Sequence, residues 1–166
     1  MKFARLMFWL LMILCPIASH AFEYDGFVSG MEKEKVISIF EQRGLKIEKR
    51  DDPGVAVGST VDSSGYRWMV ANFCDGKLVL IAKHFTPTTK SFIGLTDEMI
   101  KTNGQPTQVD TKYGIVEETG DSSSITLRWN RKNEHIGIKH TVFTSNDQVD
   151  VTYSESNACT KKRWGN

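Results

Sequence analysis

The feature that most constrains the fold is an order of elements that occurs twice, in which a short helical segment is followed by β-hairpins. In the first copy, Ser29-Gly30-Met31-Glu32 has the sequence of a capping box, which predicts the start of a helix. Val36, Ile37 and Phe40 then supply one apolar helical face, and Gly44 predicts the end of the helix. The repeat therefore predicts two structural units of the same design.

The second copy follows a joint rich in proline and threonine at residues 86–89. Residues 95–100 predict a shorter helix, which must stop at residues 103–106 because proline cannot continue a helix. The predicted organisation is a first unit over 22–89, a second unit over 90–159 and a basic tail over 160–166. The expected fold class is α+β, with two tandem helix-plus-antiparallel-sheet units, either separate or joined in one continuous curved sheet.

The first hairpin can be registered from its turn, because Asp75-Gly76 suits a two-residue type I′ connection and places Cys74 opposite Lys77. In that register an apolar layer faces the helix, and Trp68 lies directly opposite Lys83 on the other side of the hairpin. Rigid aromatic side chains on such a side are typical anchors for a protein partner. The candidate partner-binding face consists of Tyr66, Trp68, Lys83 and Phe85. Alternatively, residues 46–62 or the C-terminal tail cover these side chains.

The second copy predicts a three-stranded antiparallel meander, because apolar and polar residues alternate along three segments. Two-residue loops at Lys132-Asn133 and Ser145-Asn146 define its register. One face then carries three apolar rows, which are Ile125 with His140 and Val151, Leu127 with Ile138 and Tyr153, and Trp129 with Ile136.

Three short motifs, Gly30-Met31-Glu32-Lys33-Glu34-Lys35-Val36, Trp68-Met69-Val70 and Phe73-Cys74-Asp75-Gly76-Lys77-Leu78, resemble the helix and hairpin of the outer-membrane assembly lipoprotein family BamE (SmpA/OmlA). In the second half, Gly94-Leu95-Thr96 and Gly104-Gln105-Pro106 resemble the same elements. A tandem of such units is similar to the architecture of the β-lactamase inhibitor protein. The resemblance implies a BamE/BLIP-like tandem repeat and a protein-binding role.

The N-terminus has the layout of a secretory signal peptide over residues 1–21. Lys2 and Arg5 precede an apolar run over residues 6–17, and small residues precede a cleavage site predicted after Ala21. The run is shorter than the roughly 20 residues of a membrane-spanning helix, so no stable membrane anchor is expected after cleavage. The mature chain is close to neutral, which gives no basis for nucleic-acid binding. The expected location is periplasmic or secreted.

Cys74 and Cys159 are the cysteines that remain after the signal is removed. An even number of cysteines in an oxidising compartment predicts a disulfide between them, and two free thiols are the alternative. Closing so long a loop stabilises the fold by roughly 4 kcal/mol in the chain-entropy model.

No catalytic, cofactor-binding or metal-binding set is predicted. His135 and His140 lie five residues apart on one strand, so their side chains point to opposite faces and do not chelate one metal together. The serine runs lie in turn contexts, and the acidic residues form no calcium loop.

The predicted function is that of an exported, non-catalytic module that binds another protein, either as an inhibitor or as an accessory to envelope assembly. No cofactor is expected. Two alternatives remain open, which are a small secreted hydrolase whose ionisable groups converge only in the fold, and a structural envelope protein without a discrete site.

Overall fold

The structure, a computed structural model, describes residues 20–48, 50–62, 65–85, 89–116, 120–144, 147–156 and 159. The predicted tail at 160–166 and all but the last two residues of the predicted signal peptide lie outside these ranges. The elements in chain order are β1 (Glu23–Tyr24), β2 (Phe27–Val28), α2 (Lys33–Gln42), β3 (Lys46–Glu48), β4 (Val55–Asp62), β5 (Gly65–Cys74), β6 (Lys77–Phe85), α3 (Thr89–Asn103), β7 (Gln108–Val116), β8 (Gly120–Asn130), β9 (Glu134–Phe143) and β10 (Asp147–Glu155).

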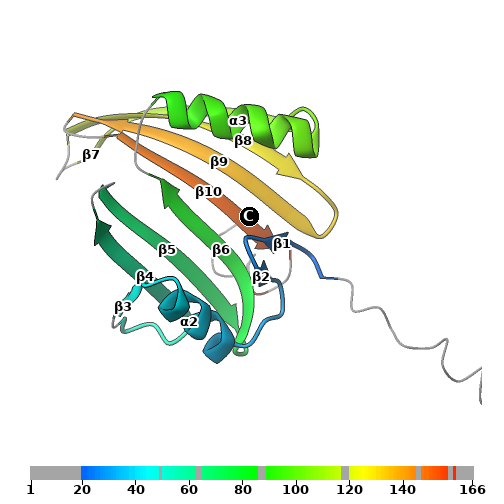
Figure 1. Cartoon of the computed structure of the whole chain (residues 1–166). Helices are drawn as coiled ribbons and strands as arrows, with labels where there is room; N and C mark the ends of the chain where they lie inside the picture. The colour runs from blue at the N-terminus through cyan, green and yellow to red at the C-terminus, as the bar shows by residue number, and fades with distance from the viewer. Residues whose placement is uncertain are drawn as a thin grey trace, which may run out of the picture.

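The described chain is dominated by one antiparallel sheet of eight strands, in the order β3-β4-β5-β6-β10-β9-β8-β7 (Figure 1). The halves join where β6 pairs with β10, from Phe85 opposite Val149 to Leu80 opposite Ser154. The prediction of an α+β fold built from two helix-plus-sheet units is wrong, because one large antiparallel sheet with two helices makes up most of the described chain. The pairing of β6 with β10 makes the two halves parts of the same sheet. Strands β3, β4 and β7, which the sequence analysis did not assign, extend the sheet at both ends.

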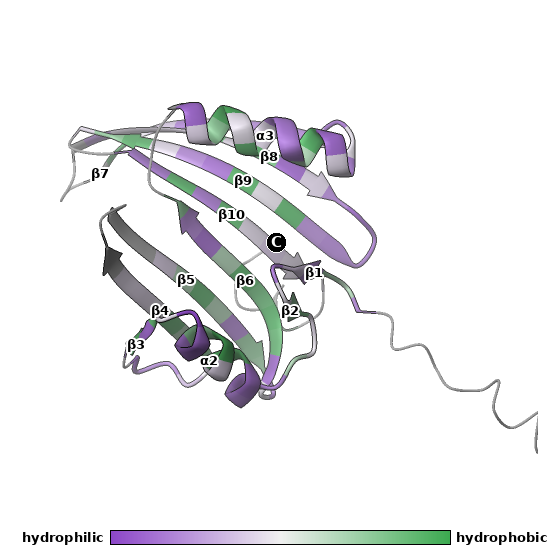
Figure 2. Cartoon of the chain, viewed as in Figure 1, coloured by the Kyte–Doolittle hydropathy of each residue, from purple (hydrophilic) through white to green (hydrophobic). Residues whose placement is uncertain are grey.

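Both helices pack on the same face of the sheet, which we call the helix face. One core cluster joins α2 to α3 through strand residues of this face. Figure 1 shows α2 beside β4 and β5, and α3 along β8 and β9. In Figure 2 apolar residues form a continuous stretch along the lower part of β6, whereas along β9 they are separated by polar or neutral residues, as in a strand with one buried face. The buried strand residues of the helix face are Ala56, Met69, Ala71, Phe73, Leu78, Ile81, Trp129, Ile136, Ile138, Val149, Val151 and Tyr153.

Helix α2 begins at Lys33, and its end at Gly44 is confirmed. Gly44 adopts a φ of 71° and donates its backbone N–H to the Glu41 carbonyl at 2.9 Å, which closes the helix. The predicted capping box is wrong, because no side chain caps this helix at Glu32. The Ser29 hydroxyl instead accepts the backbone N–H of Ala21 at 2.6 Å, which ties the start of the described chain to this segment.

Helix α3 is longer than predicted, since it starts at Thr89 rather than near residue 95. Its end at Asn103 is confirmed, and Gly104 adopts a φ of 79° there. The additional N-terminal turns include Phe92, which packs partly buried against the core. This tertiary contact outweighs the weak helical pattern of residues 89–94.

The register of the first hairpin starts as predicted and then changes. Cys74 pairs with Lys77 and Phe73 with Leu78, but Asn72 pairs with Leu80, so Val79 is an extra residue in a β-bulge. One inserted residue moves every later side chain of β6 to the opposite face.

The second half contains the predicted meander together with β7, which makes four strands. The register of β8 and β9 is confirmed, with Ile125 opposite His140 and Trp129 opposite Ile136. The β9–β10 register is wrong by two residues, since His140 pairs with Val149 rather than Val151. The connection is longer than two residues, and an even shift keeps the apolar residues on the same face.

The Cys74–Cys159 disulfide is present, as predicted. No helix within the described ranges is long and apolar enough to cross a membrane.

Candidate functional site

The four residues predicted to form one partner-binding face do not all lie on one face. Because of the bulge, Lys83 is opposite Met69 rather than Trp68 and lies on the helix face, as does Phe85. Trp68 lies on the opposite face, which we call the far face, and the side chain of Tyr66 is outside the described part. The prediction that Trp68 and Lys83 are directly opposed is therefore wrong.

Trp68 is held against its neighbours on the far face. Its ring stacks on His84, with centroids 5.0 Å apart. The Nδ1 atom of His84 lies 2.9 Å from Asp150 Oδ1, and Gln148 donates to the other carboxylate oxygen of Asp150 at 2.8 Å. The covering role predicted for residues 46–62 is wrong, because their strands β3 and β4 extend the sheet beside β5.

Lys83 links the sheet to the turn between β1 and β2. Its Nζ atom lies 3.1 Å from Asp25 Oδ2 and 5.3 Å from the ring centroid of Phe85. Arg43 of α2 donates to the same carboxylate oxygen at 2.8 Å. Burial alone would raise the pKa of Asp25, but the hydrogen bonds from Lys83 and Arg43 outweigh it and hold this pKa below its ordinary value. Lys83 thus has a structural role in this arrangement.

A group of exposed apolar side chains lies at the other end of the sheet. Their exposed fractions are 55% for Val109, 75% for Tyr113, 77% for Ile115 and 40% for Val142, and we call this group the β7 patch. Tyr113 and Val142 both pair with Ser123 of β8, so all three side chains share the helix face. Scattered exposed apolar residues are ordinary on a protein surface, but here four of them gather on β7 and β9 at one end of the sheet.

A groove of about 390 Å³ adjoins the patch. Ser123 lies between Tyr113 and Val142 on neighbouring strands, and because its side chain is much smaller than theirs, a hollow forms above it. The groove is lined by Thr111, Lys112, Tyr113, Ser123, Ser124, Ile125, His140 and Val142.

His140 is fixed at the inner side of this groove. Its ring stacks on Phe92 of α3, with centroids 5.1 Å apart, and its Nε2 atom lies 3.3 Å from Asp147 Oδ2. The side chain is 12% exposed, as expected for a residue in an apolar row with Ile125. Within the described ranges, no three metal-binding side chains cluster around His140 or elsewhere.

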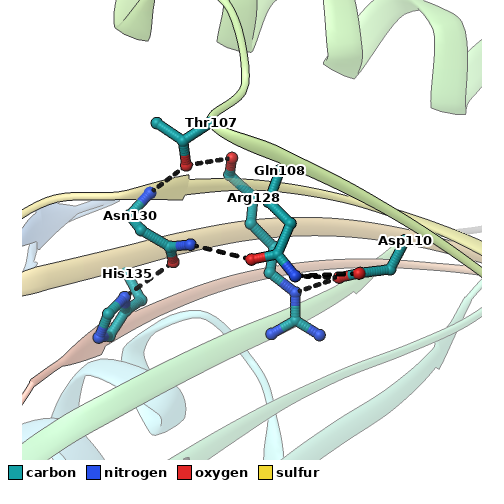
Figure 3. Close-up of polar contacts among 6 residues, drawn as sticks. All are labelled: Thr107, Gln108, Asp110, Arg128, Asn130 and His135. Atoms are coloured by element: carbon teal, nitrogen blue, oxygen red, sulfur yellow. Dashed lines mark hydrogen bonds and ion pairs between the residues drawn. The ribbon is translucent and has the colours of Figure 1, made fainter.

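A polar network on the far face braces the same edge of the sheet (Figure 3). Asp110 of β7 accepts hydrogen bonds from Gln108 at 2.9 Å and from Arg128 of β8 at 3.0 Å, and these contacts lower the pKa of its carboxyl. Asn130 donates to Gln108 at 3.2 Å and accepts from His135 at 2.9 Å. Three strands are thereby joined by side chains as well as by the backbone.

The sequence analysis missed the β7 patch because it assigned no strand to residues 108–116. The signal was present as an alternation, since Val109, Thr111, Tyr113 and Ile115 occupy every second position between polar residues and glycine.

Comparison with known proteins gives no match among protein-family models, curated proteins or solved structures.

Proposed function

We propose that this chain is an exported, non-catalytic module that binds another protein, as an inhibitor or as an accessory to envelope assembly. The observation that carries the proposal is the β7 patch beside an open groove. Tyr113 and Ile115 each expose about three quarters of their surface to water. This exposure does not stabilise an isolated domain, whereas covering these side chains with a partner would bury apolar area. A tyrosine at the centre of such a patch is a typical interface residue, because it buries a large area with few rotatable bonds.

The groove adds shape to this patch. Ser123 and Thr111 supply hydroxyl groups next to the apolar side chains, so a protein segment seated there gains apolar burial and hydrogen bonds together. His140 and Asp147 keep one geometry because Phe92 packs against the ring. A preorganised surface of this kind costs little conformational entropy on binding.

We place this function in the periplasm or outside the cell, after removal of residues 1–21. The disulfide and the layout of the N-terminal segment support this location. Phe22, the first residue after the proposed cleavage, is only 2% exposed, so the domain needs the chain from this residue onward. N-terminal sequencing of the exported protein should begin at Phe22, and a protein that retains residues 1–21 in the envelope would contradict the proposal.

The test of binding compares three tagged proteins as bait in an envelope extract. We expect the unmodified chain to retain one protein in stoichiometric amount and Tyr113→Asp to retain at most about a tenth as much, as loss of a central aromatic anchor does. Asn133→Asp adds the same charge at an exposed position of the β8–β9 turn and serves as the control. Equal retention by all three baits, or retention of nothing, would count against the proposal.

A further inference from the structure

The outer edge of β7 is an unpaired edge of the sheet in the described part of the chain. β7 is the last strand in the sheet order and pairs with β8 over nine residue pairs. A long edge strand presents a row of backbone donors and acceptors that can pair with another strand. The edge at the other end of the sheet is β3, which has only three residues.

We infer that the partner of this edge is β7 of a second copy of the chain, in an antiparallel arrangement around a two-fold axis through Thr111. This inference goes beyond the proposed function, because the second copy pairs with the backbone edge of β7, whereas the β7 patch lies on the helix face. The axis is perpendicular to the sheet, so the helix faces of both copies lie on the same side. Only registers that pair positions of the same face are then allowed.

Charge selects one register among these. With Thr111 opposite its own copy, Asp110 lies opposite Lys112 of the second copy, and this pair occurs twice. A shift of two residues in one direction places Lys112 opposite Lys112, and a shift in the other direction places Asp110 opposite Asp110. Like charges directly opposed across strands are unfavourable, whereas opposite charges are favourable. Among the alignments that keep the faces matched, the one centred on Thr111 opposes unlike charges, so charge favours it.

The same register matches the helix face. Val109 lies opposite Tyr113 of the second copy, and each of these side chains is more than half exposed in the single chain. An aromatic side chain against a β-branched one is a favourable cross-strand pair. On the far face, Gln108 lies opposite Gly114, which offers room for the Gln108–Asp110–Arg128 contacts.

The Asp110 side chain is already oriented for this pairing. Gln108 and Arg128 hold its carboxylate on the far face, where the Lys112 ammonium group of the second copy would arrive. Lys112 is exposed, and its positive charge already helps to lower the pKa of Asp110 in the single chain, so the two side chains are electrostatically matched for the same pairing between copies. The paired edges would extend one eight-stranded sheet into the next.

The register is tested by cysteine cross-linking of the mature chain under mild oxidation. Thr111 and Lys112 are both exposed, but only Thr111 lies opposite its own copy. We expect Thr111→Cys to form a covalent dimer at least about tenfold faster than Lys112→Cys, because only directly opposed Cβ atoms reach disulfide distance. Equal rates for the two variants, or no covalent dimer from either, would overturn the inference.

The second measurement is sedimentation velocity, which needs no added cysteine. We expect the unmodified chain to dimerise and Lys112→Asp to raise the dimer dissociation constant at least about tenfold, since it opposes two acidic pairs. Lys112→Asp should leave the melting temperature of the single chain unchanged. A chain that stays monomeric at the highest attainable concentration, yet still retains an envelope protein through Tyr113, overturns this inference and leaves the proposed function standing. A monomeric chain that retains nothing overturns both.

Discussion

The tightest contact between α2 and the sheet is made at Gly58 of β4, and it gives the sharpest prediction for stability. A Cβ atom on Gly58 would lie 2.8 Å from Cδ2 of Phe40 and 3.1 Å from Cβ of Leu45. Phe40 is fully buried and packs edge-on against Phe27 with centroids 5.6 Å apart, so its ring has no free space to enter. The Gly58→Ala variant therefore has to displace the helix or distort the ring.

The magnitude follows from two opposing terms. Overpacking a close-packed core costs about 1–3 kcal/mol, and the reduced freedom of the unfolded chain returns about 0.4–1 kcal/mol. A net loss of about 1–2 kcal/mol lowers the melting temperature of a domain of this size by roughly 3–8 °C. Thermal and urea unfolding followed by circular dichroism measure this change.

Gly137 of β9 provides the matched control, since a Cβ atom there would meet only the Leu127 carbonyl oxygen at 4.0 Å. Gly137→Ala should leave stability unchanged or raise it by up to about 1 kcal/mol, because alanine restricts the unfolded chain. If Gly58→Ala is as stable as Gly137→Ala, the packing of α2 on β4 described above is incorrect.

Three further predictions concern other parts of the molecule. Trp129 is 2% exposed and donates to the Gly104 carbonyl at 2.7 Å, so Trp129→Ala should lower the free energy of unfolding by roughly 3–5 kcal/mol. Trp68 is half-buried, and thermal unfolding should show a much smaller loss of stability for Trp68→Ala. Replacing Cys74 and Cys159 together by alanine should cost about 4–5 kcal/mol in urea unfolding, because their bond closes a loop with a sequence separation of 85; a loss below about 1 kcal/mol would contradict this. The pKa of Asp25 is lowered in the folded chain, so the stabilisation from its carboxylate is present above the unfolded pKa of about 3.9 and is lost as pH falls through the folded pKa. Asp25→Asn should therefore destabilise the chain at pH 7 and not at pH 2. An equal loss of stability at both pH values would refute the ion pairs.

The parts of the fold that the sequence predicts are those fixed by local chemistry. Gly44 and Gly104 end helices because each adopts a positive φ that other residues avoid. The β8–β9 register follows from a short turn and a strict alternation, so Trp129 opposite Ile136 could be predicted without any distant contact. The disulfide could be predicted because two of the three cysteines remain after the expected signal peptide, and the expected compartment is oxidising.

The parts that failed depend on contacts distant in sequence or on a single inserted residue. The bulge at Val79 leaves no mark in the hydrophobic pattern, because Val79 and Leu80 are both apolar and either fits an alternating strand. Because of that one residue, Lys83 and Phe85 lie on the helix face and not on the face of Trp68. The predicted binding face is therefore divided between the two faces of the sheet. The pairing of β6 with β10 is likewise a contact between the two halves, so the patterns within each half left separate sheets and one continuous sheet both open.

The two edges of this sheet explain why the β7 end, rather than the predicted first hairpin, is the candidate site. β3 offers three residues and connects directly to α2, so little of its edge can accept another strand. β7 offers nine residues, and its polar contacts through Asp110 and Arg128 keep it extended against β8. Tyr113 of β7 lines the groove, whose inner side is closed by His140 and the Phe92 ring of α3 that stacks on it. A sheet with one protected edge and one long, braced edge presents a single surface for strand pairing, and in this chain that surface also carries the exposed tyrosine, Tyr113.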